Sequence, residues 1–183
     1  MILIVDLSYK KNSLSFEEFV LPIASIVEKT GTDFNIKHFT ELCEEDLRSS
    51  EKVILCGTAL KDDEFLKHEE EFSWMKKINK PILGICAGMQ LIGLVFGSEL
   101  IEAKEIGMKE IKLKKPNKLF STDLYAYELH KYSIKPNEDF EILAVSDLCV
   151  QAIKHRSKEI YGVIFHPEVR QRQIIVNFVE KVS

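Results

Sequence analysis

Apolar residues in the first half of the chain fall into two alternating patterns. Short continuous apolar runs predict strands, and segments whose apolar residues recur every three or four positions predict helices. The predicted strands lie at residues 2–6, 33–39, 52–56 and 81–85. The predicted helices lie at residues 16–29, 62–78 and 87–96. Short apolar strands that alternate with helices are typical of a parallel sheet covered on both faces.

The second half has a different pattern, in which strand-like runs follow one another closely and are separated by turns. They lie at residues 107–114, 123–127, 141–146, 150–154 and 160–165, and an amphipathic helix follows at 170–182. This order predicts an antiparallel or mixed extension of the sheet. Because no linker, repeat or low-complexity segment interrupts the chain, residues 1–183 are expected to form a single α/β domain.

Composition and charge exclude several classes of protein. The chain is 45% hydrophobic and 30% charged, as is usual for a soluble globular protein. A net charge of -4 without a basic stripe argues against nucleic-acid binding, and the Lys-rich run 109–118 is expected to be an exposed strand and turn. No apolar run approaches the roughly 20 residues of a membrane span, and the opening apolar run lacks a basic leader. We therefore expect a cytoplasmic protein without membrane contact.

The four cysteines predict neither a zinc site nor a disulfide framework. They show no Cys-x-x-Cys pairing and no clustering with histidine along the sequence. Cys43 and Cys149 are expected to be small, partly buried side chains. No nucleotide-binding loop of the Gly-x-Gly-x-x-Gly or Walker type is present, so neither a cofactor nor a metal is expected.

Cys86 has the surroundings of a nucleophile. It follows the predicted strand 81–85 directly, and Gly84 and Gly88 flank it at the spacing of the Gly-x-Ser-x-Gly elbow, with cysteine in place of serine. Small neighbours allow strand and helix to approach each other around a sharp turn. The helix that begins at Ala87 would stabilise a thiolate, and the Ala87 N–H would point toward an oxyanion formed there.

An oxyanion hole needs a second N–H donor, and the loop after the third predicted strand can supply it. Thr58 is the candidate, next to Gly57, although Gly57 alone would be an ordinary strand-ending turn.

His166 and Glu168 complete a possible catalytic triad. His166 follows a predicted buried strand, which places it at the same carboxyl edge of the sheet as Cys86. Glu168 lies two residues further on, and Pro167 stiffens the connection. His166 could take the proton of Cys86 while Glu168 fixes the tautomer of the imidazole.

The motifs at 84–90 and 165–168 resemble those of the class I, or triad, glutamine amidotransferases, and the resemblance covers nearly the whole chain. It implies a flavodoxin-like fold and hydrolysis of L-glutamine to glutamate and ammonia through a Cys86 thioester. It also implies an ATP-dependent synthetase partner that receives the ammonia. Gln90 matches a position that helps hold the substrate, and Gly57 lies in the oxyanion loop. The segment 128–132, with His130 and Lys131, falls where the family has a substrate-contacting loop.

Within this family, the second half is most similar to the amidotransferase component of archaeal-type two-subunit GMP synthase. The chain departs from that pattern at residues 6–10, 56–59, 130–132 and 170–171. Thr58 stands where the family has glycine, and a β-branched residue resists positive φ. This departure motivates the hypothesis that basal activity is low and that a partner raises it.

Other functions also fit these residues. A stand-alone hydrolase of γ-glutamyl amides would use the same fold and triad but would need a pocket for a larger amine. A non-enzymatic regulatory or scaffold paralogue would keep the fold alone. The His-Pro-Glu spacing disfavours a cysteine peptidase or chaperone of similar fold.

Overall fold

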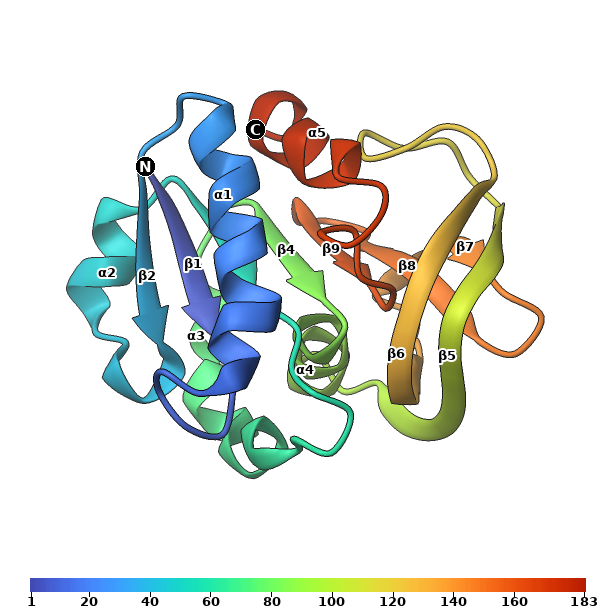
Figure 1. Ribbon diagram of the computed structural model, residues 1–183, viewed down its shortest axis with the longest axis horizontal. Helices are drawn as coiled ribbons and strands as arrows, with labels where there is room; N and C mark the ends of the chain where they lie inside the picture. The colour runs from blue at the N-terminus through green and yellow to red at the C-terminus, as the bar shows by residue number, and fades with distance from the viewer.

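The computed structural model describes residues 1–183 and contains a nine-stranded mixed sheet. The spatial order is β2-β1-β3-β4-β9-β8-β7-β5-β6, with parallel pairing from β2 to β9 and antiparallel pairing from β9 to β6 (Figure 1). The strands are β1 (Ile2–Asp6), β2 (Phe34–His38), β3 (Lys52–Leu55), β4 (Ile82–Ile85), β5 (Glu99–Leu113), β6 (Leu124–Lys135), β7 (Phe140–Val145), β8 (Val150–His155) and β9 (Ile160–Val163). This arrangement confirms the predicted α/β fold.

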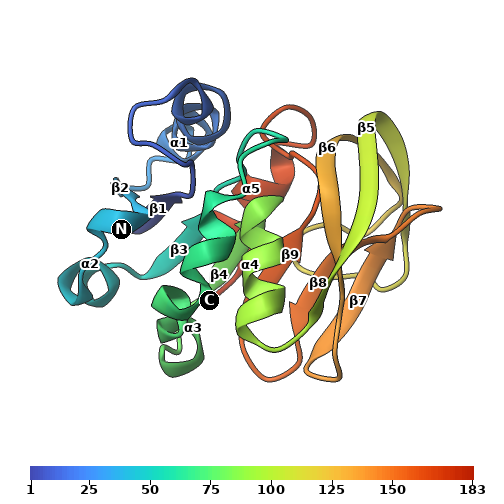
Figure 2. The same ribbon diagram turned by 90° about the horizontal axis from the view of Figure 1, so that it is seen from below.

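Helices cover both faces of the parallel part of the sheet (Figures 1 and 2). A π-helical turn, η1, leads into α1, and a 3₁₀ segment, η3, leads into α3. The bounds are η1 (Phe16–Val20), α1 (Leu21–Lys29), η2 (Phe39–Glu41), α2 (Glu44–Ser49), η3 (Glu64–Phe72), α3 (Trp74–Lys77), α4 (Ala87–Val95) and α5 (Gln173–Lys181). Helices α1 and α5 pack on one face, and α2, α3 and α4 pack on the other.

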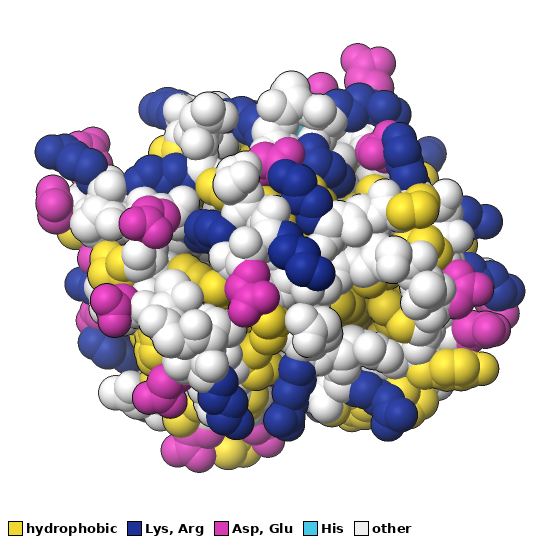
Figure 3. All heavy atoms as spheres, turned by 90° about the horizontal axis from the view of Figure 1, so that it is seen from above, with side chains coloured by type: hydrophobic (Ala, Val, Ile, Leu, Met, Phe, Trp, Pro, Cys, Tyr) yellow, Lys and Arg dark blue, Asp and Glu magenta, His cyan; other side chains and the backbone are white.

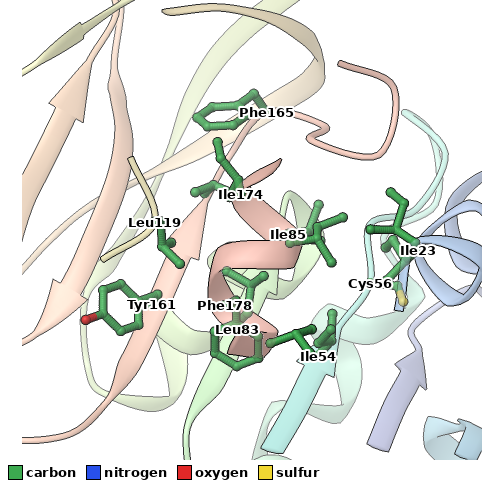
Figure 4. Close-up of a cluster of buried hydrophobic side chains, with 14 of the residues drawn as sticks. Ile23, Ile54, Cys56, Leu83, Ile85, Leu119, Tyr161, Phe165, Ile174 and Phe178 are labelled. Carbon is green, nitrogen blue, oxygen red and sulfur yellow. The ribbon is translucent and has the colours of Figure 1, made fainter. Parts of the chain in front are cut away.

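Two hydrophobic cores result, because successive residues of a strand point to opposite faces of the sheet. In β1, Ile4 joins the core beneath α1 and α5, whereas Leu3 and Val5 join the core beneath α3 and α4. Figure 4 shows the first core, in which side chains of β3, β4 and β9 meet Ile23 of α1 and Phe178 of α5. The strands are buried on both faces, which explains their continuous apolar runs.

The strands of the first half agree with the sequence prediction to within about a residue at each end. The predicted helix at 62–78 is wrong in kind, since η3 is a 3₁₀ segment with a kink at His68 (φ -114°, ψ 17°) and only α3 is α-helical. Helix α2 was not predicted, because its residues are mostly charged and only Asp46 is buried.

The largest difference concerns β5 and β6, which extend to 15 and 12 residues and form a long ribbon (Figure 1). The predicted strands at 107–114 and 123–127 cover only part of them. In particular, residues 128–132 lie inside β6 and not in a loop. Both strands carry charged side chains on buried as well as exposed positions, so their apolar alternation is weak.

Charged side chains of both signs are interspersed over the face shown in Figure 3, without a continuous basic patch. Surface ion pairs include Lys118–Glu159 and Lys115–Glu141. None of the helices combines the length and the apolar character that crossing a membrane requires.

Phe178 is a sensitive test of the first core. Its ring is fully buried, so Phe178→Ala is expected to lower the free energy of unfolding by about 3–5 kcal/mol. Leu14→Ala is a suitable control, because that side chain is 68% exposed and its loss should change stability by no more than about 0.5 kcal/mol. Urea unfolding of both variants measures the difference, and equal midpoints would contradict this account of the core.

Candidate active site

Cys86 lies in a strained turn between β4 and α4. Its backbone has φ 50° and ψ -105°, a conformation that residues with a side chain rarely adopt. The Cys86 N–H donates a hydrogen bond to the Val163 carbonyl of β9 (2.8 Å), which holds the turn in place. The flanking glycines permit it: a Cβ at Gly84 would lie 2.5 Å from the Gly88 carbonyl oxygen, and one at Gly88 would collide with the Leu55 carbonyl. The elbow predicted from the sequence is therefore present.

His166 follows β9 and is fully buried beside Glu168. The distance from His166 Nδ1 to Glu168 Oε1 is 2.7 Å, so Nδ1–H donates to the carboxylate and Nε2 is left without a hydrogen-bond partner. The backbone holds the ring in position, because the His166 N–H donates to the Tyr127 carbonyl of β6 (2.9 Å). The Phe19 ring packs against the imidazole, with 5.2 Å between ring centroids.

Gly57, in the loop after β3, shows how closely Cys86 and His166 approach each other. A Cβ at Gly57 would lie 2.7 Å from His166 Cε1 and 3.4 Å from Cys86 Cβ. The ends of β3, β4 and β9 thus meet at one point, as the carboxyl ends of parallel strands should. Any side chain at position 57 would displace the imidazole.

Electrostatics favour a protonated His166. Burial by itself would lower its pKa, but the charge of Glu168 and then that of a Cys86 thiolate outweigh burial and raise the pKa well above 6.5. A positive imidazolium between a carboxylate and a sulfur is the arrangement in which a thiol loses its proton to histidine.

Two backbone N–H groups beside Cys86 are free to donate. Ala87 is the first residue of α4, where an N–H has no acceptor within the helix. The Thr58 N–H makes no backbone hydrogen bond, and Thr58 is not among the residues with positive φ. The Thr58 hydroxyl donates to the Asp62 carbonyl (3.1 Å), and the Asp62 carboxylate accepts from the Tyr9 N–H (2.8 Å), so the loop is fixed at both ends.

A small cavity lies beside Cys86, between the loop after β3 and strand β6. Thr58, Cys86, Ala87, Gln90, His130 and Lys131 all contribute to its lining. Its volume of about 20 Å³ has room for a single water molecule. Glutamine is much larger than this cavity.

Of the predicted substrate-binding residues, Gln90 and Lys131 make contacts at the cavity, whereas the His130 side chain contacts buried carboxylates. Gln90 is buried, and its Nε2 donates to the Tyr132 carbonyl (3.0 Å) across the cavity. Lys131 forms an ion pair with Asp63, and both residues line the cavity. The His130 imidazole is fully buried, and its Nε2 faces the carboxylates of both Glu128 and Glu105.

Asp63 was not recognised from the sequence. The acidic pair at 62–63 looked like the start of a helix, whereas it lies in the loop that faces β6. An isolated acidic residue carries no local signal of a partner 68 positions away. The Leu129 carbonyl, which accepts from Cys86 Sγ (3.7 Å), could not be found either, because a backbone group leaves no trace in the sequence.

The sequence profile described as glutamine amidotransferase class-I matches residues 15–181. The chain belongs to this family. A relative from Picrophilus torridus, named as a glutamine-hydrolyzing subunit of GMP synthase, is 35% identical over 147 residues, which are 74% of this chain and 78% of the relative. A protein of the same name from Methanocaldococcus jannaschii is 46% identical over 109 residues, but the match spans only 54% of this chain and 58% of that protein.

The fold of this amidotransferase-family chain also resembles that of solved structures. A crystal structure from Thermoplasma acidophilum, described as a candidate subunit of GMP synthase, has a TM-score of 0.85 and 27% sequence identity. The similarity covers 97% of this chain and 91% of that one. The family expected from the two motifs is therefore confirmed, together with its fold.

The effect of the Glu168 charge on the amidotransferase can be tested by measuring the pKa of His166. The pKa of His166 is higher in the folded state than in the unfolded state, where it is about 6.5, so protonation of His166 stabilises the fold. This stabilisation is fully present at a pH below about 6.5, and it is lost as the pH rises through the folded-state pKa. Glu168→Gln removes the main favourable charge, so the His166 pKa should fall and part of this stabilisation should disappear.

Ring-nitrogen NMR across a pH titration measures the His166 pKa in the wild type and in Glu168→Gln. His155 is an internal control, because burial lowers its pKa and it makes no contact with Glu168. An unchanged His166 pKa in the variant would show that another group stabilises the imidazolium.

Proposed function

We propose that the chain hydrolyses L-glutamine to glutamate and ammonia through a thioester on Cys86, and that it passes the ammonia to an ATP-dependent synthetase partner. The observation that carries this proposal is the strained Cys86 beside a buried His166–Glu168 pair in a chain of the amidotransferase family. The relatives named as glutamine-hydrolyzing subunits of GMP synthase suggest that the partner completes a GMP synthase.

In the proposed reaction, the Cys86 thiolate attacks the side-chain amide carbon of glutamine. The His166 imidazolium gives its proton to the amide nitrogen, the C–N bond breaks, and ammonia leaves. Water then attacks the thioester while His166 takes one of its protons, the C–S bond breaks, and glutamate is released with the Cys86 thiolate and the His166 imidazolium restored. Glu168 keeps the proton on Nδ1, so that Nε2 faces the sulfur throughout.

The tetrahedral intermediates carry a negative oxygen that needs donors. We assign this role to the N–H groups of Ala87 and Thr58, because both are free and both lie at the cavity beside Cys86. Neither requires the positive φ that a β-branched residue resists. The small size of the cavity supports the hypothesis of low basal activity, since a partner that displaces β6 or the loop would make room for the substrate.

Glutamine is a zwitterion, and Lys131 and Asp63 have the matching charges. The pair lies at the cavity next to Gln90, where the α-carboxylate and α-ammonium groups of a bound glutamine could replace the existing ion pair. We propose that Lys131 binds the α-carboxylate. Charge-assisted hydrogen bonds of this kind contribute about 1.5–3 kcal/mol.

The two alternatives are less well supported. A stand-alone hydrolase of larger γ-glutamyl amides has no support from the relatives, which are named as glutamine-hydrolyzing subunits. The strained backbone at Cys86 lowers the stability of the fold by on the order of 1–3 kcal/mol. A scaffold paralogue would not need this strain, because it performs no reaction at Cys86.

Glutaminase activity of the purified chain, measured as glutamate released over time, tests the proposal. Cys86→Ala should abolish turnover, and His166→Ala should lower kcat by about 10⁴-fold or more, with a smaller loss for Glu168→Ala. Cys43→Ala is the matched control, since that cysteine lies far from the site at the start of α2. A synthetase from the same organism should raise the wild-type rate.

The outcomes separate the three functions. Cys86-dependent hydrolysis that a synthetase increases supports the amidotransferase. Cys86-dependent hydrolysis of larger γ-glutamyl amides in preference to glutamine supports the stand-alone hydrolase. No hydrolysis with or without the synthetase supports the scaffold.

Lys131→Met tests the recognition of the α-carboxylate. The KM for glutamine should rise about tenfold or more, corresponding to roughly 1.4 kcal/mol, with a smaller change in kcat. The wild type should prefer glutamine to 4-aminobutanamide, which lacks the α-carboxylate, and the variant should lose this preference. Lys61→Met is the control, because Lys61 lies in the same loop as Asp63 but forms no ion pair with it. A preserved preference in Lys131→Met would rule out this role.

A further inference from the structure

A buried polar cluster lies where the β5–β6 ribbon meets the β7–β8 turn. It contains Glu105 of β5, Glu128 and His130 of β6, and Cys149 just before β8. The β5–β6 register places Glu105 opposite His130, and Glu128 lies two residues from His130 on the same face of the strand. None of these residues takes part in the proposed glutaminase chemistry.

The hydrogen bonding of this cluster is incomplete. Glu128 Oε1, His130 Nδ1 and Gln151 Oε1 are buried without a hydrogen-bond partner. His130 Nε2 and Glu128 Oε2, which are 3.1 Å apart, have only each other. Leaving such groups unpaired is costly, and two buried carboxylates beside one imidazole call for additional positive charge. No lysine or arginine forms an ion pair with Glu105 or Glu128.

Three donor atoms of the cluster lie close enough together to share one metal ion. His130 Nε2 is 3.1 Å from Glu128 Oε2 and 3.7 Å from Glu105 Oε2, and Cys149 Sγ is 3.3 Å from Glu105 Oε2. Zinc bonds of about 2.0–2.3 Å in a tetrahedron place neighbouring ligand atoms about 3.3–3.6 Å apart. The donor atoms of Glu105, His130 and Cys149 all lie within 4.8 Å of one another.

We propose that this cluster is a structural zinc site, with Cys149 Sγ, His130 Nε2 and Glu105 Oε2 as ligands. A shift of the Glu128 carboxylate, whose Oε2 lies 3.1 Å from His130 Nε2, supplies the fourth ligand. One thiolate, one imidazole and two carboxylates suit a borderline cation such as Zn²⁺ better than Mg²⁺ or Ca²⁺. Binding releases the thiol proton of Cys149, and the metal takes the place of the hydrogen bond from Cys149 to Glu105.

Neighbouring side chains already orient the ligands. Gln151 Nε2 donates to Glu105 Oε2 (2.7 Å), and the Ser146 hydroxyl donates to the same oxygen (2.9 Å). The Cys149 N–H donates to Ser146 Oγ (3.1 Å), which fixes the turn that presents the sulfur. Outer hydrogen bonds of this kind are typical of metal centres.

The site would also affect the glutaminase cavity. His130 lies between Leu129, whose carbonyl accepts from Cys86, and Lys131, which pairs with Asp63. A metal bound to His130 on one face of β6 would therefore fix the segment that covers Cys86 on the other.

Titration of Zn²⁺ and of Co²⁺ into the purified chain tests the proposal. The Cys86→Ala variant is the background for every measurement, because Cys86 and His166 could themselves bind a metal. We expect one metal ion per chain, a thiolate-to-cobalt charge-transfer band, and a higher Tm with Zn²⁺. Cys149→Ser and His130→Gln should each weaken binding by about 100-fold or more.

Matched controls separate the cluster from other histidines and cysteines. Cys43→Ser replaces an exposed cysteine and His155→Gln a buried histidine of β8, and both should bind as tightly as the background. If Cys149→Ser does not fold, X-ray absorption at the zinc edge of the Cys86→Ala, Cys43→Ser chain replaces it, with one sulfur ligand expected. Three results would overturn the proposal: no binding in the Cys86→Ala background, binding that survives Cys149→Ser, or a zinc ion without a sulfur ligand. In each case the buried groups of the cluster would share protons and hold no metal.

Discussion

The close contact between β4 and α4 is the constraint on which the rest of the site depends. Gly84 and Gly88 have no side chains, so strand and helix approach until only a sharp turn can join them, and that turn is Cys86. Its positive φ is costly, and the hydrogen bond from Cys86 N–H to Val163 holds it in place. Since Val163 ends the strand that leads into His166, the same contact sets the positions of Cys86 and His166, the nucleophile and the base of the proposed reaction.

Strand β6 is the second determinant, because its two faces have different surroundings. On one side, Lys131 and the carbonyls of Leu129 and Tyr132 enclose the cavity beside Cys86. On the other side, Glu128 and His130 are buried against β5 and the β7–β8 turn. Movement of this strand would therefore open the cavity and disturb the buried cluster together, which couples substrate entry to the packing of the ribbon.

The sequence predicted the features that depend on local pattern. The Cys86 elbow follows from the glycine spacing, and the His166–Glu168 pair follows from two polar residues placed directly after a buried strand. Non-local features were out of reach. The pairing of Lys131 with Asp63, and of Cys149 with Glu105 and His130, depends on how the β5–β6 ribbon curls over the sheet. Strand β6 was underestimated for a related reason, because its buried Glu128 and His130 look like surface residues in a sequence. Sequence patterns assume that buried positions are apolar, and that assumption fails where buried polar groups serve a purpose.

The buried side-chain atoms that lack a hydrogen-bond partner are concentrated in two places. Apart from atoms of Asp6 and Ser13, they belong to the His166–Glu168 pair or to the cluster around His130. A folded chain keeps few such atoms, because each costs free energy unless something else compensates for it. At His166, the atom without a partner is Nε2. In the proposed reaction, this nitrogen exchanges a proton with the Cys86 sulfur and the substrate during turnover. The atoms around His130 take no part in the proposed reaction, so their compensation would be permanent, and the proposed cation would satisfy an imidazole and two carboxylates together.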